Sequence, residues 1–149
     1  MGNFKTGEST LKKFLIAFQT MSQSNLIDLE SVTLKRVVDG DTIIVLDQNQ
    51  NEVRVRLIGV DTPKSVHPDE TKNTTDGDVA SAYTKSQLKK GQTLYLEYDK
   101  ERFDPYGRTL AYVWLEANVD PSDLNDIQSN MYNAKLIVEG CAVAKRFPP

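Results

Sequence analysis

The sequence predicts an α+β domain in which short strands form a partly closed barrel and helical segments are inserted between or beside them. Five stretches of the chain show the alternating or continuous apolar pattern of short strands, and turn-forming residues separate them. Three other segments repeat apolar residues at helical spacing. Because the strands do not alternate regularly with helices, a barrel is favoured over a parallel α/β sheet.

Composition limits the chain to one ordinary domain with a short appendage. The 149 residues include 18 basic and 21 acidic side chains, which gives a formal net charge of −3. General nucleic-acid binders are usually strongly basic, so any contact with nucleic acid must depend on a local cluster or on a bound metal ion. We predict an N-terminal amphipathic helix with its connector over residues 1–30, and the barrel domain over residues 31–149.

Neither stable membrane insertion nor an internal disulfide is expected. No apolar run approaches the ~20 residues that a transmembrane helix needs. Phe14–Phe18 is also shorter than the core of a signal peptide, which has about 7–15 residues. Cys141 is the only cysteine, and its small apolar neighbours predict a buried structural thiol rather than a nucleophile. These observations leave the location of the protein open.

An amphipathic helix is predicted near the N-terminus. Its apolar stripe consists of Leu11, Phe14, Leu15, Phe18 and Met21. These positions follow helical spacing, and Ser9 or Thr10 is suited to cap the first turn. The stripe is interpreted as a packing face. A membrane-surface role is the weaker alternative, because Lys12 and Lys13 are the only basic residues beside it.

The pattern changes to that of β-strands from Val32 onward. The predicted strands are Val32–Leu34 with Val37–Val38, Thr42–Leu46, Val53–Ile58, Thr93–Tyr98 and Arg108–Leu115. The polar run Asp47–Asn51 predicts a turn between the second and the third strand. In the third strand, alternation places Val53, Val55 and Leu57 on one face. Trp114, on the last strand, is expected in the core.

A long loop and a helix are predicted after the third strand. Residues 63–77 are polar and irregular, which is typical of a loop. The helix is expected over Asp78–Lys90, with Gly91 as its end. Its inward side chains are predicted to be Val79, Ala82 and Tyr83.

Another helix is predicted near the C-terminal end of the barrel. It carries Ile127, Met131, Ala134 and Val138 at helical spacing, and Gly140 is its expected stop. The acidic stretch Glu116–Asp126, which contains no Lys or Arg, is interpreted as a solvated loop. Cys141–Lys145 is expected to form a last short strand.

Two acidic clusters lie at the ends of predicted strands. Asp39–Asp41 precedes the second strand, and Asp61–Pro63 follows the third. Carboxylates combined with a backbone carbonyl, such as that of Thr62, and water form a hard-cation site of the calcium or magnesium type. Taken singly, the clusters are explained by a hairpin turn and a strand exit. Taken together, and beside unusual basic residues, they favour one shared site.

The basic residues beside these clusters are Arg56 and Arg108. Arg56 lies on the third strand, shortly before Asp61, and Arg108 follows the tight turn Asp104–Gly107. An arginine fork can bind a phosphate with two N–H groups and stabilise charge that develops on it. Either arginine alone is more simply a surface ion pair. The combination predicts a site that holds a phosphodiester next to a divalent cation.

Four motifs in this order resemble the staphylococcal nuclease (thermonuclease) family. They are Asp39–Thr42, Arg56–Pro63, Ala80–Lys85 and Asp104–Tyr112. Their order and approximate spacing match the family from about Val32 to Ala144, which is most of the chain. The resemblance implies a five-stranded OB-fold barrel with two or three helices. It also implies calcium-dependent cleavage of phosphodiesters in DNA or RNA, and it is compatible with an extracellular location.

The resemblance also implies roles for single residues. Calcium would be held by Asp41, Asp61 and the Thr62 carbonyl, with Asp39 behind these ligands. The phosphate would be held by Arg56 and Arg108, and Tyr106 would lie in the nucleotide pocket. These roles are expectations carried over from the matching motif positions.

Lys64 departs from the family pattern at the position of the general base. The family places a glutamate there to activate the attacking water, whereas a protonated lysine has no basic atom to offer and its charge opposes a nearby cation. Lys64 can instead grip a phosphate, and Asp69, Glu70 or water activated by the cation are other sources of a base. Losing a general base costs about 10²–10⁴-fold in rate. Weak or absent cleavage is therefore expected, with metal and phosphate binding partly retained. His67, in the same loop, is expected to be solvated.

A catalytically silent OB-fold module that binds nucleic acid or protein is the competing interpretation. Lys64 and the negative net charge favour it, and barrels of this type often bind without chemistry. The family also continues past Pro148–Pro149 into a helix that packs on the barrel. One hypothesis is that the predicted N-terminal helix occupies the same surface, either from the same chain or from a second copy. The oligomeric state stays open.

Overall fold

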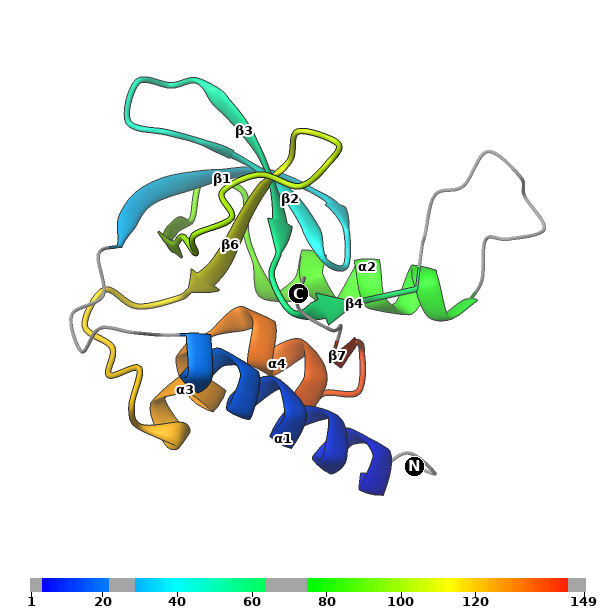
Figure 1. Ribbon diagram of the computed structural model, residues 1–149. Coiled ribbons are helices and arrows are strands. Elements are labelled where there is room, and N and C mark those ends of the chain that lie inside the picture. Colours follow the sequence, from blue (N-terminus) through cyan, green and yellow to red (C-terminus); the bar gives the residue numbers. More distant parts are fainter. Residues whose placement is uncertain (1–3, 22–28, 64–74, 145–149) are drawn as a thin grey trace.

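A closed five-stranded barrel lies at the centre of the computed structural model, which describes residues 4–21, 29–63 and 75–144 (Figure 1). Its strands are β1 (Glu30–Asp39), β2 (Thr42–Leu46), β3 (Glu52–Leu57), β5 (Thr93–Glu97) and β6 (Thr109–Trp114). Neighbours pair in the order β1-β2-β3-β6-β5, and β5 returns to β1 to close the barrel. All pairs are antiparallel except β3 and β6, which run parallel. The predicted five-stranded barrel is thus confirmed.

Strand β1 pairs with its two neighbours mainly through different parts of its length. Its first half pairs with β5 through Glu30–Thr33, and its second half pairs with β2 up to Asp39. The register with β2 shifts twice, once between Leu34 and Arg36 and once between Val37 and Asp39. Bulges of this kind increase twist and curvature, which a five-stranded barrel needs in order to close.

The barrel interior is filled by small and branched apolar side chains. From the five strands these are Val32, Leu34, Ile43, Val45, Val55, Leu57, Leu94, Leu96, Ala111 and Val113, each at most 3% exposed. Most of them alternate along their strands, which is the pattern expected when one face of each strand is turned inward. The hydrophobic effect of this interior is the main stabilising term of the barrel.

A layer of helices covers one side of the barrel. It contains α1 (Phe4–Met21), α3 (Leu124–Asn130) and α4 (Tyr132–Val138), and Figure 1 shows α1 beside α4 below the barrel. Helix α2 (Thr75–Gln87) packs against β1. A small antiparallel ribbon, made of β4 (Val60–Asp61) and β7 (Val143–Ala144), joins the barrel to this layer. None of the described helices is long and apolar enough to cross a membrane.

Helix α1 buries four of the five residues of its predicted stripe, and the side chain of the fifth, Met21, lies outside the described part of the structure. Phe14, Leu15 and Phe18 are at most 8% exposed, and Leu11 packs against them at the edge of the core. The helix packs on α4 and β7 of the same chain. It begins at Phe4, so the predicted start at Ser9 or Thr10 is wrong by more than one turn.

Aromatic rings join α1 to strand β6. Phe18 lies edge-on to Tyr112 with ring centroids 4.8 Å apart, and edge-on to Trp114 at 6.2 Å. Phe14 meets Tyr112 at 6.3 Å. We call Phe14, Phe18, Tyr112 and Trp114 the aromatic cluster. All four are at most 2% exposed, so the expected core position of Trp114 is confirmed.

The buried face of helix α2 matches its sequence prediction only at Tyr83, which is half-buried and packs against the core. Val79 is 55% exposed and Ala82 is also exposed, whereas Ala80 and Thr84 are buried. Polarity alone does not mark the inner face here, because close backbone approach requires small side chains. The helix instead turns a narrow face of small residues to the barrel, which allows its backbone to approach closely.

The single helix predicted over Ile127–Val138 is two helices. Met131 has extended backbone angles, φ −93° and ψ 117°, and forms a β-bridge with Trp114. This one extended residue ends α3 and starts α4. Because the break resets the helical phase, Val138 is 51% exposed, while Ile137 is buried in its place.

Three smaller expectations about the C-terminal third of the chain are settled by the structure. The last short strand is confirmed as β7. Cys141 is only half-buried, so the expectation of a buried thiol was too strong. In the acidic stretch, Asp120 and Asp123 are exposed, as predicted, and their carboxylates accept backbone N–H groups from Ser122 and Asn125.

Candidate cation and phosphate site

The turn between β1 and β2 places Asp41 inside the protein. Its side chain is fully buried. Oδ1 accepts a hydrogen bond from Thr42 Oγ1 at 3.0 Å, and Oδ2 accepts one from the Thr62 backbone N–H at 3.0 Å. The Asp41 carbonyl accepts the N–H of Leu57, also at 3.0 Å. These contacts fix Asp41 between β2, β3 and the segment that follows β4.

Arg56 projects from β3 into the same region. Its Nη1 donates to the carbonyl oxygens of Leu57 and Val60 at 2.7 and 2.8 Å. Its Nη2 lies 3.0 Å from Oδ1 of Asp61 and 3.3 Å from Oδ2 of Asp41. A guanidinium has its donors in a fixed fork, so these four acceptors hold the group rigidly.

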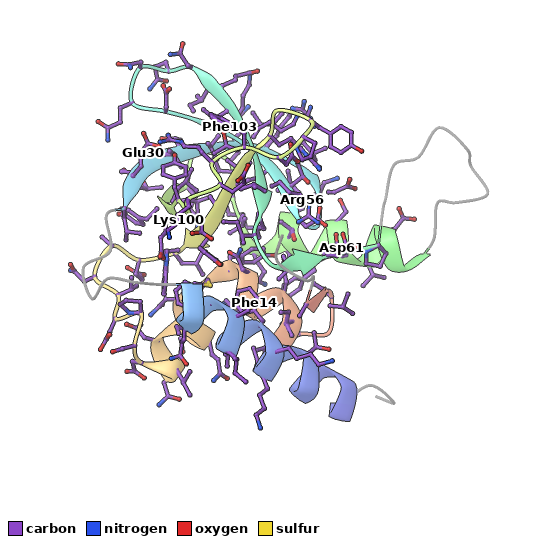
Figure 2. All side chains as sticks on the ribbon, in the orientation of Figure 1. Phe14, Glu30, Arg56, Asp61, Lys100 and Phe103 are labelled. Atoms are coloured by element: carbon purple, nitrogen blue, oxygen red, sulfur yellow. The ribbon has the colours of Figure 1, made fainter. Side chains whose placement is uncertain are left out.

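Asp61 completes what we call the carboxylate–arginine cluster, namely Asp41, Arg56 and Asp61. Figure 2 shows the side chains of Arg56 and Asp61 next to each other where β3 and β4 meet. The Asp61 side chain is 46% exposed, whereas Asp41 is fully enclosed. One carboxylate therefore faces solvent and the other does not, so a ligand has access to the cluster from the Asp61 side.

Thr62 contributes a backbone donor and a buried hydroxyl. Its side chain is 4% exposed, and its Oγ1 has no hydrogen-bond partner among the described residues. A buried hydroxyl without a partner is costly and is usually explained by a ligand, an ion or a water. Oxygen atoms from two carboxylates and this threonine are hard donors, which fits calcium or magnesium.

The number of protein ligands at this position is small. No group of three or more His, Cys, Asp or Glu side chains is present within residues 4–21, 29–63 and 75–144. A cation at the cluster would therefore bind through two carboxylates and complete its coordination with backbone oxygens and water, as hard cations commonly do. Asp39, the remaining acidic residue of the turn, is half-buried beside it.

Arg108 lies on the hairpin between β5 and β6, and its ion-pair partner there is Asp104. Arg108 Nε donates to Asp104 Oδ2 at 2.6 Å, and the backbone N–H groups of Tyr106 and Arg108 donate to Asp104 Oδ1 at 2.9 and 2.8 Å. Burial raises the pKa of Asp104, but these hydrogen bonds outweigh it and hold that pKa below the ordinary value of 3.8. One ionised carboxylate thus shapes the turn and orients the arginine.

The two arginines differ in how available they are to a ligand. The Arg108 side chain is 27% exposed, against 6% for Arg56. Tyr106 is 84% exposed, and its ring lies 5.6 Å from the Arg108 guanidinium carbon. The structure therefore places an exposed aromatic ring next to the more accessible arginine, while Arg56 stays within the carboxylate–arginine cluster.

Several predicted site residues fall outside the described part of the chain. Lys64, at the position of the expected general base, is one of them. His67, Asp69 and Glu70 are the others. The roles given to these residues remain predictions.

Sequence reasoning missed three residues that support the site. Asp104 was seen only as part of a turn, although its four-residue spacing from Arg108 is typical of an ion pair. Thr84 donates to the Gly40 carbonyl at 2.9 Å, and Tyr132 donates to Thr84 at 2.7 Å. The spacing of Ala80 and Thr84 offered a signal for the second residue. Tyr132 offered none, because its direction depends on the break at Met131.

Comparison with known proteins supports the resemblance seen in the motifs. The model of the family described as staphylococcal nuclease homologue matches residues 54–149. The chain is 50% identical over 120 residues to a thermonuclease of Staphylococcus intermedius, which covers 80% of this chain and 62% of that protein. It is 46% identical over 114 residues to a thermonuclease of Staphylococcus hyicus, covering 76% and 59% of the two chains.

A more distant relative comes from another genus. Endonuclease YncB of Bacillus subtilis is 40% identical over 98 residues, which is 65% of this chain and 45% of that protein. The chain thus spans less than two thirds of the length of each of these three relatives. The family model covers well over half of the chain, and the five strands form a barrel as expected. The chain belongs to the staphylococcal nuclease homologue family.

Proposed function

We propose that this domain binds calcium and hydrolyses phosphodiester bonds of nucleic acid, either DNA or RNA. The observation that carries the proposal is that Asp41 and Asp61 meet at one guanidinium nitrogen of Arg56, at 3.3 and 3.0 Å. A buried ion pair that only stabilised the barrel would not need a second carboxylate that is half open to solvent. Relatives named thermonuclease and endonuclease give the same reaction class.

In this proposal, one set of residues holds the ion and another holds the phosphate. Asp41, Asp61 and Thr62 hold the ion, and Asp39 supports the turn that carries Asp41. When bound, calcium supplies positive charge next to the phosphate oxygens. Arg56 becomes available to a phosphate when the ion engages its carboxylate partners. Arg108 binds the phosphate from the hairpin side, and the exposed ring of Tyr106 lies beside the nucleotide.

The reaction is an in-line displacement at phosphorus. The oxygen of a water molecule forms a new bond to phosphorus while the bond to the 5′ oxygen breaks. The proton lost by the water passes to a base, and the leaving oxygen takes up a proton from solvent. Arg56 and Arg108 stabilise the negative charge that builds up on the phosphate oxygens, because their donors are already oriented before the reaction.

Lys64 occupies the position at which the mechanism requires a general base. A protonated lysine cannot accept the proton of water, so we propose that hydrolysis is slow while ion and phosphate binding are retained. The second candidate function is a module that binds nucleic acid without cutting it. It applies if the loss of the general base abolishes hydrolysis rather than slowing it. The identity of Lys64 is the observation that favours this second function.

Digestion of plasmid DNA in calcium or in chelator tests the proposal. We expect weak calcium-dependent cleavage by the wild type, a gain of about 10²-fold or more in Lys64→Glu, and loss in Arg108→Ala. Arg102→Ala is the matched control, because it removes an exposed positive charge from the same hairpin. Robust wild-type cleavage, or no gain in Lys64→Glu, contradicts the proposed impairment. Cleavage that survives both chelator and Arg108→Ala contradicts the proposed site.

A further inference from the structure

A buried chain of hydrogen bonds runs from helix α4 to the turn that carries Asp41. The Tyr132 hydroxyl on α4 lies 2.7 Å from Thr84 Oγ1 on α2, and Thr84 Oγ1 lies 2.9 Å from the carbonyl oxygen of Gly40. Tyr132 and Thr84 are both fully buried. Two helices that are distant in sequence are therefore tied to one peptide group of the β1–β2 turn.

The direction of these hydrogen bonds is fixed by chemistry. The Gly40 carbonyl can only accept, so the single proton of the Thr84 hydroxyl must be donated to it. Thr84 can then only accept from its other neighbour, so Tyr132 must be the donor. A tyrosine hydroxyl is protonated at neutral pH in any case, and burial raises the pKa of Tyr132 further.

Close packing holds the same peptide from the side. A Cβ atom placed on Gly40 would lie 3.0 Å from Ala80 Cβ and 3.0 Å from Thr62 Oγ1. Ala80 and Thr84 are one turn apart on α2, so one face of this helix both packs against the turn and holds its carbonyl. The Gly40 peptide has little freedom to shift while these contacts last.

The position of this peptide determines where the Asp41 carboxylate lies. Gly40 directly precedes Asp41, whose Oδ2 accepts the Thr62 N–H at 3.0 Å and lies 3.3 Å from Arg56 Nη2. The side chain of Thr62 also lies against Gly40. A displacement of the Gly40 carbonyl would thus be passed to Asp41 and to Thr62, two of the three proposed calcium ligands.

We propose that Thr84 is a positioning residue for the calcium site and that Tyr132 sets the orientation of the Thr84 hydroxyl. The inference rests on the proposed function, because it takes Asp41, Asp61 and Thr62 as the ligands. Partners that orient metal ligands from behind typically contribute about 10–100-fold to affinity or activity. Thr84 acts one peptide away from a ligand, so we expect an effect at the low end of that range.

The test is a calcium titration by calorimetry on the complete chain, without nucleic acid. Thr84→Val keeps the shape of the side chain but removes the hydroxyl, and its Kd for calcium is expected to rise about tenfold. Thr84→Ser keeps the hydroxyl and is expected to restore affinity to within about twofold. Tyr132→Phe leaves the bond from Thr84 to Gly40 in place, so its Kd is expected to rise only about two- to threefold.

A stability-matched control separates positioning from general weakening. Ile127→Val removes one methylene group from a fully buried position on α3, outside the carboxylate–arginine cluster. It is expected to lower the urea midpoint in chelator while leaving the calcium Kd unchanged, whereas Thr84→Val should change both. A Thr84→Val variant that loses stability but keeps the wild-type Kd overturns the inference.

The remaining outcomes are also decisive. If Thr84→Val does not fold, Tyr132→Phe is the variant to measure. An unchanged calcium Kd in Tyr132→Phe then overturns the proposed role of the hydrogen-bond chain from Tyr132 through Thr84 to Gly40. Should the wild type bind no calcium at all, the proposed calcium site is wrong and the inference falls with it. That result differs from one in which the wild type and Thr84→Val bind calcium equally well, which overturns only the role of Thr84.

Discussion

The aromatic cluster and the carboxylate–arginine cluster are both largely buried, but different forces hold them together. The first consists of rings from α1 and β6 that meet edge-on at 4.8–6.3 Å. The second consists of charged groups joined by hydrogen bonds of defined direction, and one of its members, Asp61, is 46% exposed. Apolar contact tolerates small shifts, whereas hydrogen bonds to charged groups are lost when the geometry changes.

This difference indicates that the aromatic cluster mainly supports stability and that the carboxylate–arginine cluster mainly supports ion binding. We expect substitutions in the aromatic cluster to lower stability without altering ion binding once the protein is folded. Substitutions in or behind the carboxylate–arginine cluster should alter ion binding by more than they alter stability. Four predictions test this separation.

The largest effect is expected from Phe18→Ala. Phe18 is fully buried against Tyr112 and Trp114, and truncation of a buried phenylalanine typically costs about 3–5 kcal/mol. Urea unfolding followed by Trp114 fluorescence measures the change. The control is Ile16→Ala on the exposed face of the same helix, which should stay within about 0.5 kcal/mol. Equal effects of the two variants would show that α1 does not pack as described.

Gly40→Ala is expected to lower stability by less than Phe18→Ala does, and to weaken calcium binding as well. The added methyl group would meet Ala80 and Thr62 at 3.0 Å, and overpacking of this kind costs about 1–3 kcal/mol. Because the strain falls on the turn before Asp41, the calcium Kd should rise as well. Unfolding and calorimetry on the same sample check both. A loss of stability with an unchanged Kd would mean that the turn relaxes without moving Asp41.

Asp61→Asn separates ion binding from stability most clearly. Its side chain is half exposed, so the substitution should change stability by less than about 1 kcal/mol. The loss of one of two carboxylates should weaken calcium binding about tenfold or more. Asp120→Asn serves as the charge-matched control, since Asp120 is an exposed residue of the acidic stretch. A similar loss in both variants would point to general electrostatics rather than to a site.

The smallest effect is expected from Glu97→Gln, next to the aromatic cluster. Burial raises the pKa of Glu97, and the hydrogen bond from Trp114 Nε1 at 2.8 Å offsets this only in part. Because the folded-state pKa lies above the ordinary value of 4.5, the wild type loses stability as pH rises through that folded-state value. Glutamine keeps the acceptor without the charge.

At pH 7, Glu97→Gln should therefore have a higher thermal midpoint than the wild type, and its free energy of unfolding should be larger by at most about 1 kcal/mol. The gain should shrink as the pH falls and vanish below 4.5, the ordinary pKa of a glutamate. Glu116→Gln, at an exposed position, is the control without a pH-dependent gain. A gain that stays constant across this pH range would contradict the assigned cause.

Much of the barrel was predictable because its strands follow simple patterns. The alternation of Val53, Val55 and Leu57 and the turn at Asp47–Asn51 both describe local structure, and both are found. The amphipathic stripe of α1 was equally clear, since Phe14 and Phe18 repeat at helical spacing. What these features share is that neighbouring residues determine them.

The errors occurred where distant contacts override local patterns. Met131 fits a helix in sequence, but its bridge to Trp114 holds it extended and divides the helix in two. Helix α2 turns Ala80 and Thr84 inward because the close approach to Gly40 excludes larger side chains. The residues of the candidate site were proposed from motif order, whereas the contact of Tyr132 with Thr84 depends on tertiary structure alone.

The place of α1 in the chain has a consequence for how the protein is made. Its stripe packs on β6, which a ribosome adds much later, since roughly 90 residues separate Phe18 from Tyr112. At about 5–20 residues per second, synthesis of that interval takes about 5–18 s. During this time Phe14 and Phe18 lack the surface that buries them in the finished protein. Helix α1 is thus synthesised well before the strand that buries its aromatic side chains, and it can dock fully only once β6 has been made.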